Sequence, residues 1–460
     1  MNAVEEMKRF FEPRSVALLG VSRRTGEGNF NILENLLSYG YEGKIYPVNP
    51  KASEILGVPT YSRIADVSDE VDLAIINLPR SLVPGTVQEC IEQGIHSIII
   101  VTQGFADAGD EEGRQLQKEL DKFIEVNGVR ILGPNSLGTV NTFTRFSSSF
   151  AKMDMTKVPI SIICQTGVFF ELPESLLIGK GIDLGNACDV NFVDSLEYFE
   201  QDNETKVIVL HIEGMRDGKR FLKIAGRTAL KKPIITLKTG KSEYAAKVAR
   251  SHTGSLVGSD EIWATALKQS GLIRVTDIDE LSDLAGAFSL LPTMKGRSVG
   301  IVSSSGGFNI ISIDACQKYD LEIAKLSPVT IRRINALSPS WQSVGNPADM
   351  WPACMVLKQP VTRVVTETLD AMLSDHKVDA ALLIWYMSSD QVCADLGHLL
   401  AKLADTHKDK PLVCFFYGDH VTEAKDRLKA RSGVSVFNSP DRAVRSLSRL
   451  AQYSNIRRGF

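Results

Sequence analysis

Short runs of apolar, mostly β-branched residues recur along the chain, separated by longer stretches with helical spacing. This alternation is typical of parallel α/β sheets, in which a crossover helix follows each buried strand. About the first 140 residues contain such runs at 15–19, 44–48, 71–76, 97–101 and 129–132. Five strands joined by crossover helices predict a doubly wound fold of the nucleotide-binding type.

The same pattern recurs in two further sets. Strands are predicted at 160–163, 206–210 and 233–237 in one set, and at 298–302, 380–385, 411–416 and 434–437 in the other, which ends with a helix over 440–452. A polar stretch, 142–157, and a turn-rich segment, 292–296, separate the sets. We therefore predict the α/β class with three consecutive doubly wound domains, at residues 1–145, 155–291 and 297–460.

Composition and charge exclude several classes of function. The chain has 52 basic and 55 acidic residues, a net charge of −3, which argues against a strongly basic nucleic-acid-binding protein. It contains no apolar stretch long enough to span a membrane and no secretory signal. Its seven cysteines have no CxxC spacing, which predicts reduced thiols rather than disulfides or a zinc site. We expect a cytoplasmic protein with no nucleic-acid or membrane partner.

Strand-to-helix loops are where such sheets bind ligands, because backbone N–H groups at helix starts attract anions. The loop over 20–29 has no clean GxGxxG motif. The second strand is followed by Asn49 and Lys51, where an NAD-binding fold has an acidic residue for the ribose hydroxyls. A lysine suits a nucleotide with an extra phosphate, as in NADP or coenzyme A. A plain turn with a solvated lysine fits equally well.

Two other loops of this kind are Cys164–Gly167 and Ser303–Gly307. Each could present free N–H groups to a phosphate, and each could equally be a tight turn with a helix cap. Their occurrence in successive domains favours two helix ends converging on one phosphate.

The loop over 250–260 surrounds His252 with glycines and serines. A histidine in such a loop could be a nucleophile, a general base or a surface residue. Glu213 follows a strand end and is either a functional carboxylate or a surface acid. The nearby Gly240-Lys241-Ser242 is not a Walker motif, because Ile235 stands where that motif has its first glycine.

Taken together, these segments resemble the NDP-forming acyl-CoA synthetases, relatives of the succinyl-CoA synthetase α subunit. FEPRSVALLGVSRR, VTQGFAD and ILGPNSLGTVN are similar to the family's CoA-binding domain. CQTGVFF and RSHTGSLVGSDEIWATALKQSGLIRV are similar to its central ligase domain, and SVGIVSSSGGF to its third domain. The resemblance covers nearly the whole chain and implies a Rossmann-like CoA-binding domain followed by two flavodoxin-like ligase domains.

The resemblance also implies roles for individual residues. His252 would be phosphorylated on nitrogen, with Glu213 accepting a hydrogen bond from the other ring N–H. Two helix starts would hold the phosphoryl group, one at Gln165, Thr166 and Gly167, the other at Ser304, Ser305, Gly306 and Gly307. Coenzyme A would lie along Gly20, Val21, Ser22 and Arg23 (pyrophosphate), Asn49 and Lys51 (a phosphate), Thr102, Gln103 and Gly104 (pantetheine arm) and Asn135 (thiol end).

The implied reaction is reversible. A nucleoside triphosphate phosphorylates His252, the phosphoryl group moves to a small carboxylic acid, and the CoA thiol attacks the resulting acyl phosphate. The family's ATP-grasp module, which binds ATP or ADP and Mg²⁺, has no place in the three predicted domains. The resemblance therefore implies a separate ATP-grasp β subunit in an α₂β₂ assembly, with no metal site on this chain. The acid, the choice of ATP or GTP and the physiological direction stay open.

The chain departs from the family pattern at three loops: Cys164–Gly167 replaces Ser-Gln-Ser-Gly, Gly185–Cys188 replaces Gly-Asn-Lys, and Ser303–Gly307 replaces Asn-Ala-Gly-Gly. These changes indicate a reshaped acid pocket, so acetate is not assumed as the substrate. An alternative hypothesis is a non-catalytic CoA-binding sensor or scaffold, which has no need for His252 and Glu213. An NADP-dependent oxidoreductase is a further alternative, but it leaves the histidine loop unexplained.

Overall fold

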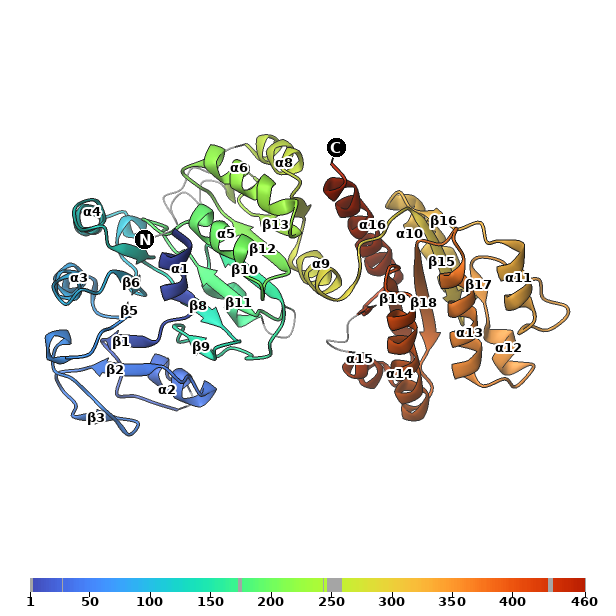
Figure 1. The fold of residues 1–460 in the computed structure, drawn as a ribbon, viewed down its shortest axis with the longest axis horizontal. Coiled ribbons are helices and arrows are strands. Elements are labelled where there is room, and N and C mark those ends of the chain that lie inside the picture. The colour runs from blue at the N-terminus through green and yellow to red at the C-terminus, as the bar shows by residue number, and fades with distance from the viewer. Residues whose placement is uncertain are drawn as a thin grey trace. The chain divides into compact units, whose positions relative to one another are not determined.

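The computed structural model describes residues 3–26, 28–172, 176–242, 244–245, 259–428 and 433–459. It divides into two compact units, residues 1–281 and 282–460 (Figure 1). Within the described residues, the strands form three large sheets and one two-stranded ribbon, and the first two large sheets belong to the first unit. The predicted α/β class with three wound sheets is confirmed, whereas the predicted domain boundaries stay a prediction.

The first sheet has the strand order β2-β1-β5-β6-β7, with every neighbouring pair parallel. Its strands are β1 (Ser15–Leu19), β2 (Lys44–Val48), β5 (Leu73–Ile76), β6 (Ser97–Ile100) and β7 (Arg130–Leu132). The segments around them form α1 (Ala3–Phe11), α2 (Ile32–Tyr39), β3 (Glu54–Ile55), β4 (Val58–Pro59), η1 (Ile64–Asp66), η2 (Arg80–Leu82), α3 (Val83–Glu92), η3 (Ala106–Ala108) and α4 (Glu111–Asn127). Because the strand order reverses at β1, the carboxyl ends of β1 and β5 flank the crevice in which such sheets bind ligands.

The second sheet has the order β14-β13-β12-β10-β11-β8-β9. Its strands are β8 (Gly138–Asn141), β9 (Phe146–Ser147), β10 (Ile160–Cys164), β11 (Lys180–Asp183), β12 (Val207–Ile212), β13 (Ile234–Lys238) and β14 (Ile273–Val275). Its helices are η4 (Gly167–Glu171), α5 (Phe192–Gln201), α6 (Gly218–Ala229) and α8 (Asp260–Gln269), and α9 (Ile278–Leu290) follows β14 along the chain. The β10, β12 and β13 strands are buried along their whole length, as expected for a sheet covered on both faces.

The sequence analysis did not predict the hairpin β8–β9, which overlaps the polar stretch 142–157. The hairpin extends the second sheet, and β8 pairs antiparallel with β11. Its polar residues are buried because they bond to one another: the backbone N–H of Thr139 donates to Ser148 Oγ at 2.7 Å, and Thr139 Oγ1 donates to the carbonyl of Phe10 at 2.6 Å. Polarity along the chain therefore does not mark a linker here.

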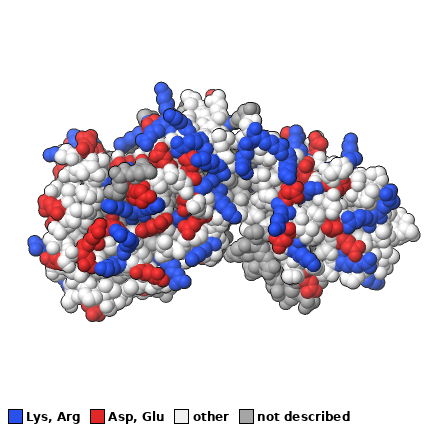
Figure 2. All heavy atoms as spheres, in the orientation of Figure 1, with Lys and Arg blue, Asp and Glu red and all other residues white. Residues whose placement is uncertain are grey.

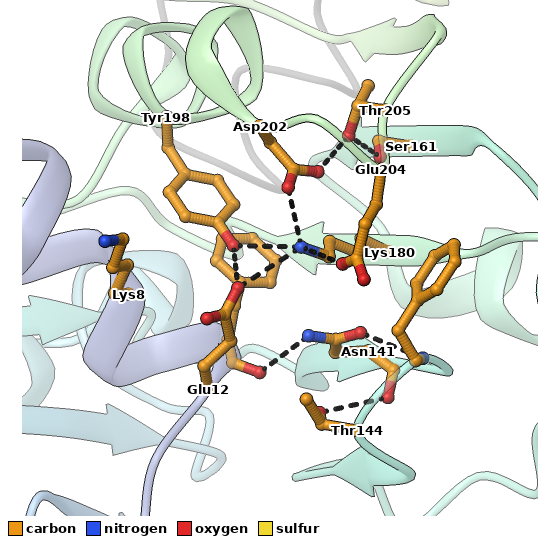
Figure 3. A network of polar contacts seen from close by, with 12 residues as sticks. Lys8, Glu12, Asn141, Thr144, Ser161, Lys180, Tyr198, Asp202, Glu204 and Thr205 are labelled. Atoms are coloured by element: carbon orange, nitrogen blue, oxygen red, sulfur yellow. Dashed lines mark hydrogen bonds and ion pairs between the residues drawn. The ribbon is translucent and has the colours of Figure 1, made fainter.

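A buried lysine joins α1 to the second sheet. The side chain of Lys180 on β11 is 1% exposed, and its Nζ lies 2.9 Å from Asp202, 2.8 Å from Glu204 and 3.2 Å from Glu12 (Figure 3). Among the described residues, these three acids are the one group whose carboxylates lie close enough to share a metal ion. One ammonium group lies among the three carboxylates, and this ion-pair network ties the residue after α1 to β11 and to the segment after α5.

The third sheet, in the second unit, is parallel throughout, with the order β16-β15-β18-β19-β20 and with β17 also paired to β15. Its strands are β15 (Ser298–Ser303), β16 (Glu322–Ile323), β17 (Ala348–Asp349), β18 (Ala380–Tyr386), β19 (Leu412–Tyr417) and β20 (Val434–Phe437). Its helices are α10 (Gly306–Lys318), α11 (Pro328–Asn335), α12 (Trp351–Met355), α13 (Val361–Ser374), α14 (Asp390–Thr406), α15 (Val421–Leu428) and α16 (Pro440–Arg457).

The surface agrees with the near-neutral composition. In the view of Figure 2, basic and acidic side chains are interspersed over both units. In the part of the chain that the structure describes, no helix is both long and apolar enough to cross a membrane.

Candidate active site

The loop after β1 begins at Gly20, which lies at the switch point of the first sheet. Gly20 has a φ of +90°, and a Cβ at this position would lie 2.3 Å from the carbonyl oxygen of Asn77. Only glycine fits such a close approach in this backbone conformation. The chain can therefore turn sharply at the strand end, which leaves the following backbone next to the crevice.

The end of β2 is tied to this loop by Asn49. Its Nδ2 donates to the carbonyl of Val21 at 3.0 Å, and its Oδ1 accepts from the backbone N–H of Lys51 at 2.8 Å. Arg23 Nη1 donates to the carbonyl of Lys51 at 3.4 Å, and both cationic side chains are exposed. The structure thus brings together the residues predicted to bind the CoA phosphates, although Asn49 acts by holding the loop.

The beginning of α2 is ordered by Asn31, which the sequence analysis did not select. Its side-chain oxygen accepts from the backbone N–H of Glu34 at 3.2 Å and so caps the helix. Its Nδ2 donates to the carbonyls of Ser22 at 3.0 Å and Arg24 at 3.1 Å. One buried asparagine therefore holds both the loop and the helix start.

The loops after β6 and β7 contain the residues predicted for the pantetheine arm. Thr102 Oγ1 donates to the carbonyl of Leu78 at 2.6 Å, and the backbone N–H of Asn135 donates to the carbonyl of Thr102 at 3.0 Å. The backbone N–H of Gly104 donates to Asp107 at 3.0 Å. These bonds fix the two loops against each other.

A cavity of about 740 Å³ joins the two halves of the first unit. Its lining includes residues predicted for the CoA arm and for the phosphate loop, namely Thr102, Gln103, Asn135, Gln165, Thr166 and Gly167. Apolar side chains of Leu137, Phe150 and Val168 complete part of the wall. Gly104 is not among the lining residues, so its predicted contact with the arm stays a prediction.

Gln165 connects the phosphate loop to the predicted catalytic carboxylate. Its Oε1 accepts from the backbone N–H groups of Glu213 at 2.8 Å and Gly214 at 3.1 Å. Gln165 is buried, and Glu213 follows β12, one strand away from β10. His252 lies outside the described residues, and α8 begins at Asp260 with Ser259 in the N-cap position.

The element after Gln165 differs from the helix start that the resemblance implies. Residues 167–171 form a short 3₁₀ helix, η4, in which both Phe169 and Phe170 are buried. A 3₁₀ helix this short has a small dipole, so any phosphate binding here rests on individual N–H groups.

Lys238 at the end of β13 is a residue near the site that the sequence analysis missed. It is 1% exposed, its Nζ donates to the carbonyl of Glu213 at 2.8 Å and to that of Thr239, and it lies 5.5 Å from the centre of the Trp263 ring. Burial lowers its pKa to about 8. The sequence did contain a signal for Lys238, because a charged residue at the end of a mostly apolar strand is unusual.

His211 on β12 is also buried next to this region. Its Nε2 lies 3.1 Å from Thr239 Oγ1, and its ring packs 4.7 Å from that of Phe169. Burial lowers its pKa to about 4, so the ring is neutral near pH 7. This histidine therefore supports the packing of η4 and carries no charge into the site.

In the second unit, the predicted phosphate loop lies between β15 and α10. The side chain of Ser305 caps α10 by accepting from the backbone N–H of Phe308, and Gly306 and Gly307 form its exposed first turn. Ser304 Oγ accepts from the backbone N–H of Tyr386 at 3.0 Å and lies 3.1 Å from the hydroxyl of Tyr417. The first N–H groups of such a helix are suited to an anion. The convergence of this loop with that at Gln165 stays a prediction.

Comparisons with known proteins find families that match both parts of the first unit. Residues 14–142 match a family described as a CoA binding domain, and residues 158–288 match the succinyl-CoA ligase like flavodoxin domain. A solved structure of Ca. Korarchaeum cryptofilum dinucleotide forming acetyl-coenzyme A synthetase 1, in complex with phosphate and ADP, superposes with a TM-score of 0.88 and 30% identity, covering 98% of this chain and 97% of that one.

Two relatives differ in length in an informative way. The acetate–CoA ligase [ADP-forming] II subunit alpha of Pyrococcus furiosus is 33% identical over 452 residues, which cover 96% of this chain and 97% of that subunit. The acetate–CoA ligase [ADP-forming] of Methanocaldococcus jannaschii is 35% identical over 459 residues, which cover 98% of this chain but 63% of that enzyme. The chain therefore belongs to the family of ADP-forming acid–CoA ligases, and its match covers nearly the whole of the Pyrococcus furiosus α subunit.

Proposed function

We propose that this chain is the α subunit of an enzyme that reversibly converts a carboxylic acid, CoA and ATP to acyl-CoA, ADP and phosphate. The observation that carries the proposal is the cavity of about 740 Å³, which is lined by the residues predicted for the CoA arm and by the Gln165 loop. A ligase of this kind needs both in one place, because the thiol must reach the activated acyl group before water does. The names of the relatives support the same class of reaction.

In this proposal His252 is the nucleophile. A ring nitrogen takes the terminal phosphoryl group of ATP and releases ADP, and the acid's carboxylate oxygen then takes the phosphoryl group from the ring. The CoA thiol, losing its proton, attacks the acyl carbon and displaces phosphate. Glu213 would accept from the second ring N–H and fix the tautomer. Gln165 supports this role, because its Oε1 bonds to the backbone N–H groups of Glu213 and Gly214 and so holds that loop.

Family membership supports further proposals about the partner and the substrate. We propose that an ATP-grasp β subunit holds ATP or ADP with Mg²⁺, that the assembly is α₂β₂, and that it works in the cytoplasm on a small carboxylic acid. The Pyrococcus furiosus relative supports a partner, since its name designates a subunit alpha. The CoA site, the phosphorylated histidine and the site of acyl transfer would then lie on this chain.

The test is histidine labelling. The complex purified from the native host is incubated with γ-³²P-ATP and Mg²⁺, using wild type, His252→Asn and, as a matched control, His376→Asn, whose side chain is 82% exposed in the second unit. We expect an acid-labile, alkali-stable label on wild type and on the control, and none on His252→Asn. Absence of label from wild type that binds both CoA and its partner would contradict the proposal and favour a CoA-binding sensor or scaffold.

A further inference from the structure

Lys238 is a buried lysine that the proposed reaction steps do not use. It ends β13, and its ammonium group contacts two backbone carbonyls and one aromatic ring. Within the described residues, no carboxylate lies at ion-pair distance from its Nζ. A buried charge without an ion-pair partner opposes folding, and it is found in proteins mainly where it serves a site.

The contacts of Lys238 join three segments around the predicted catalytic carboxylate. The carbonyl of Glu213 belongs to the loop after β12, that of Thr239 follows β13, and Trp263 lies on α8. The Glu213 segment is thus held from two sides, because its N–H also donates to Gln165 at 2.8 Å. A protonated lysine has three N–H donors, which is the number needed for two carbonyls and one ring face.

We propose that the charged form of Lys238 positions Glu213 for the phosphorylation of His252, and so sets the alkaline limit of that step. This inference rests on the proposed function. When the ammonium group loses its proton, the neutral amine keeps two N–H donors and gains a lone pair. A lone pair that faces a carbonyl oxygen or the face of an aromatic ring is repelled, so at least one of the three contacts is lost and the Glu213 loop is released.

The groups around Lys238 bring its pKa into a pH range that an experiment can cover. Burial lowers its pKa from 10.5 to about 8; Asp260 on α8 and Glu213 raise it, whereas Arg274 on β14 and Lys241 lower it. His211, on the neighbouring strand β12, adds no positive charge, because burial and the charge of Lys238 lower its pKa to about 4. Among the described residues, these are the charged groups with the largest effects on the pKa of Lys238.

Deprotonation of Lys238 has opposite effects on the rate of phosphorylation and on the stability of the fold. If the rate follows the protonated fraction, phosphorylation is about tenfold slower one pH unit above the pKa. The folded chain also binds fewer protons than the unfolded chain between the two pKa values, so the Lys238 contribution to stability rises with pH in that window. A loss of labelling that comes from Lys238 is therefore not accompanied by unfolding.

The experiment measures initial rates of histidine labelling by γ-³²P-ATP and Mg²⁺ in the native complex, from about pH 7 to about pH 9.5, a range that brackets the titration. The variants are Lys238→Arg, which keeps a charge, and Lys238→Met, which removes it. Lys219→Met is the control, since Lys219 is exposed in the first turn of α6. We expect about a tenfold fall by about pH 9 in wild type and control, less than about a twofold fall in Lys238→Arg, and a low, flat profile in Lys238→Met.

Each outcome either supports or overturns the inference. An alkaline fall that persists in Lys238→Arg and Lys238→Met, or that is absent from wild type, overturns it while leaving the labelling of His252 intact. Wild type that takes no label at any pH overturns the proposed function as well. If both lysine variants fail to fold, the wild-type profile decides: a fall near pH 8 without a lower melting temperature supports the inference, and no fall overturns it.

Discussion

Lys51 tests the proposed CoA site at the scale of a single residue. It is exposed beside Arg23, and Asn49 holds its backbone against the Gly20 loop. Replacing Lys51 with alanine removes a charge that is proposed to meet a CoA phosphate. We expect the Kd for CoA to rise about fivefold, equivalent to ~1 kcal/mol, because an exposed ion pair contributes little more. Isothermal titration calorimetry with CoA measures this change in Kd.

The control for this prediction lies at the beginning of the strand that precedes Lys51. Lys44, at the beginning of β2, pairs with Asp69 at 2.8 Å and is itself exposed. Lys44→Ala has the same loss of formal charge but should leave CoA affinity unchanged. Equal weakening by both substitutions would mean that general electrostatics, and not a specific contact, accounts for the result.

The roles of single residues could be predicted where they depend only on neighbouring residues in the chain. Gly20, Asn49 and Lys51 could be selected because a strand end and its following turn are adjacent in the chain. The contacts of Lys238 could not be predicted, because its partners at 213, 239 and 263 meet only when β12, β13 and α8 come together. The position of His252 lies outside the described residues, so its role stays a prediction from the resemblance.

At the scale of elements, the network around Lys180 holds α1, β11 and α5 together. The carboxylates around Lys180 raise its pKa although burial opposes the charge, so it stays protonated at neutral pH. Lys180→Met leaves Asp202, whose side chain is 8% exposed, without its cation. We expect a loss of about 3 kcal/mol in the free energy of unfolding of the first unit, measured by urea denaturation. Lys8→Met, which breaks an exposed pair with Glu5, should change it by less than about 0.5 kcal/mol.

Strands were predicted well where apolar residues form a simple pattern along the chain. They were predicted poorly where buried polar groups form hydrogen bonds with each other. Apolar runs located the five strands of the first sheet, β10, β12 and β13 of the second sheet, and β15, β18, β19 and β20 of the third. The short strands β11, β14, β16 and β17 were not predicted. The hairpin β8–β9 was missed because Thr139 and Ser148 satisfy each other inside the second sheet. The resemblance implied a helix start at Gln165, Thr166 and Gly167, where the structure has the short 3₁₀ helix η4.

At the scale of the whole molecule, the relatives differ in length. This chain covers 97% of the Pyrococcus furiosus alpha subunit but 63% of the Methanocaldococcus jannaschii enzyme. The longer relative therefore contains a further region, and an ATP-dependent reaction requires a nucleotide site. In the function proposed above, a partner subunit holds that nucleotide site.

This proposal predicts a division of labour between the purified chain and its partner. The chain alone should bind CoA, since the predicted CoA-binding residues all lie within the first unit, and it should take no label from γ-³²P-ATP and Mg²⁺. Adding the partner should restore labelling without changing the Kd for CoA by more than about twofold, because the CoA site is already complete. The two measurements are titration calorimetry with CoA and acid-labile ³²P incorporation, and His252→Asn is the control for specific labelling. Label on the chain alone would contradict the division, because the chain would then hold its own nucleotide site; loss of CoA binding without the partner would mean that the partner completes the CoA site.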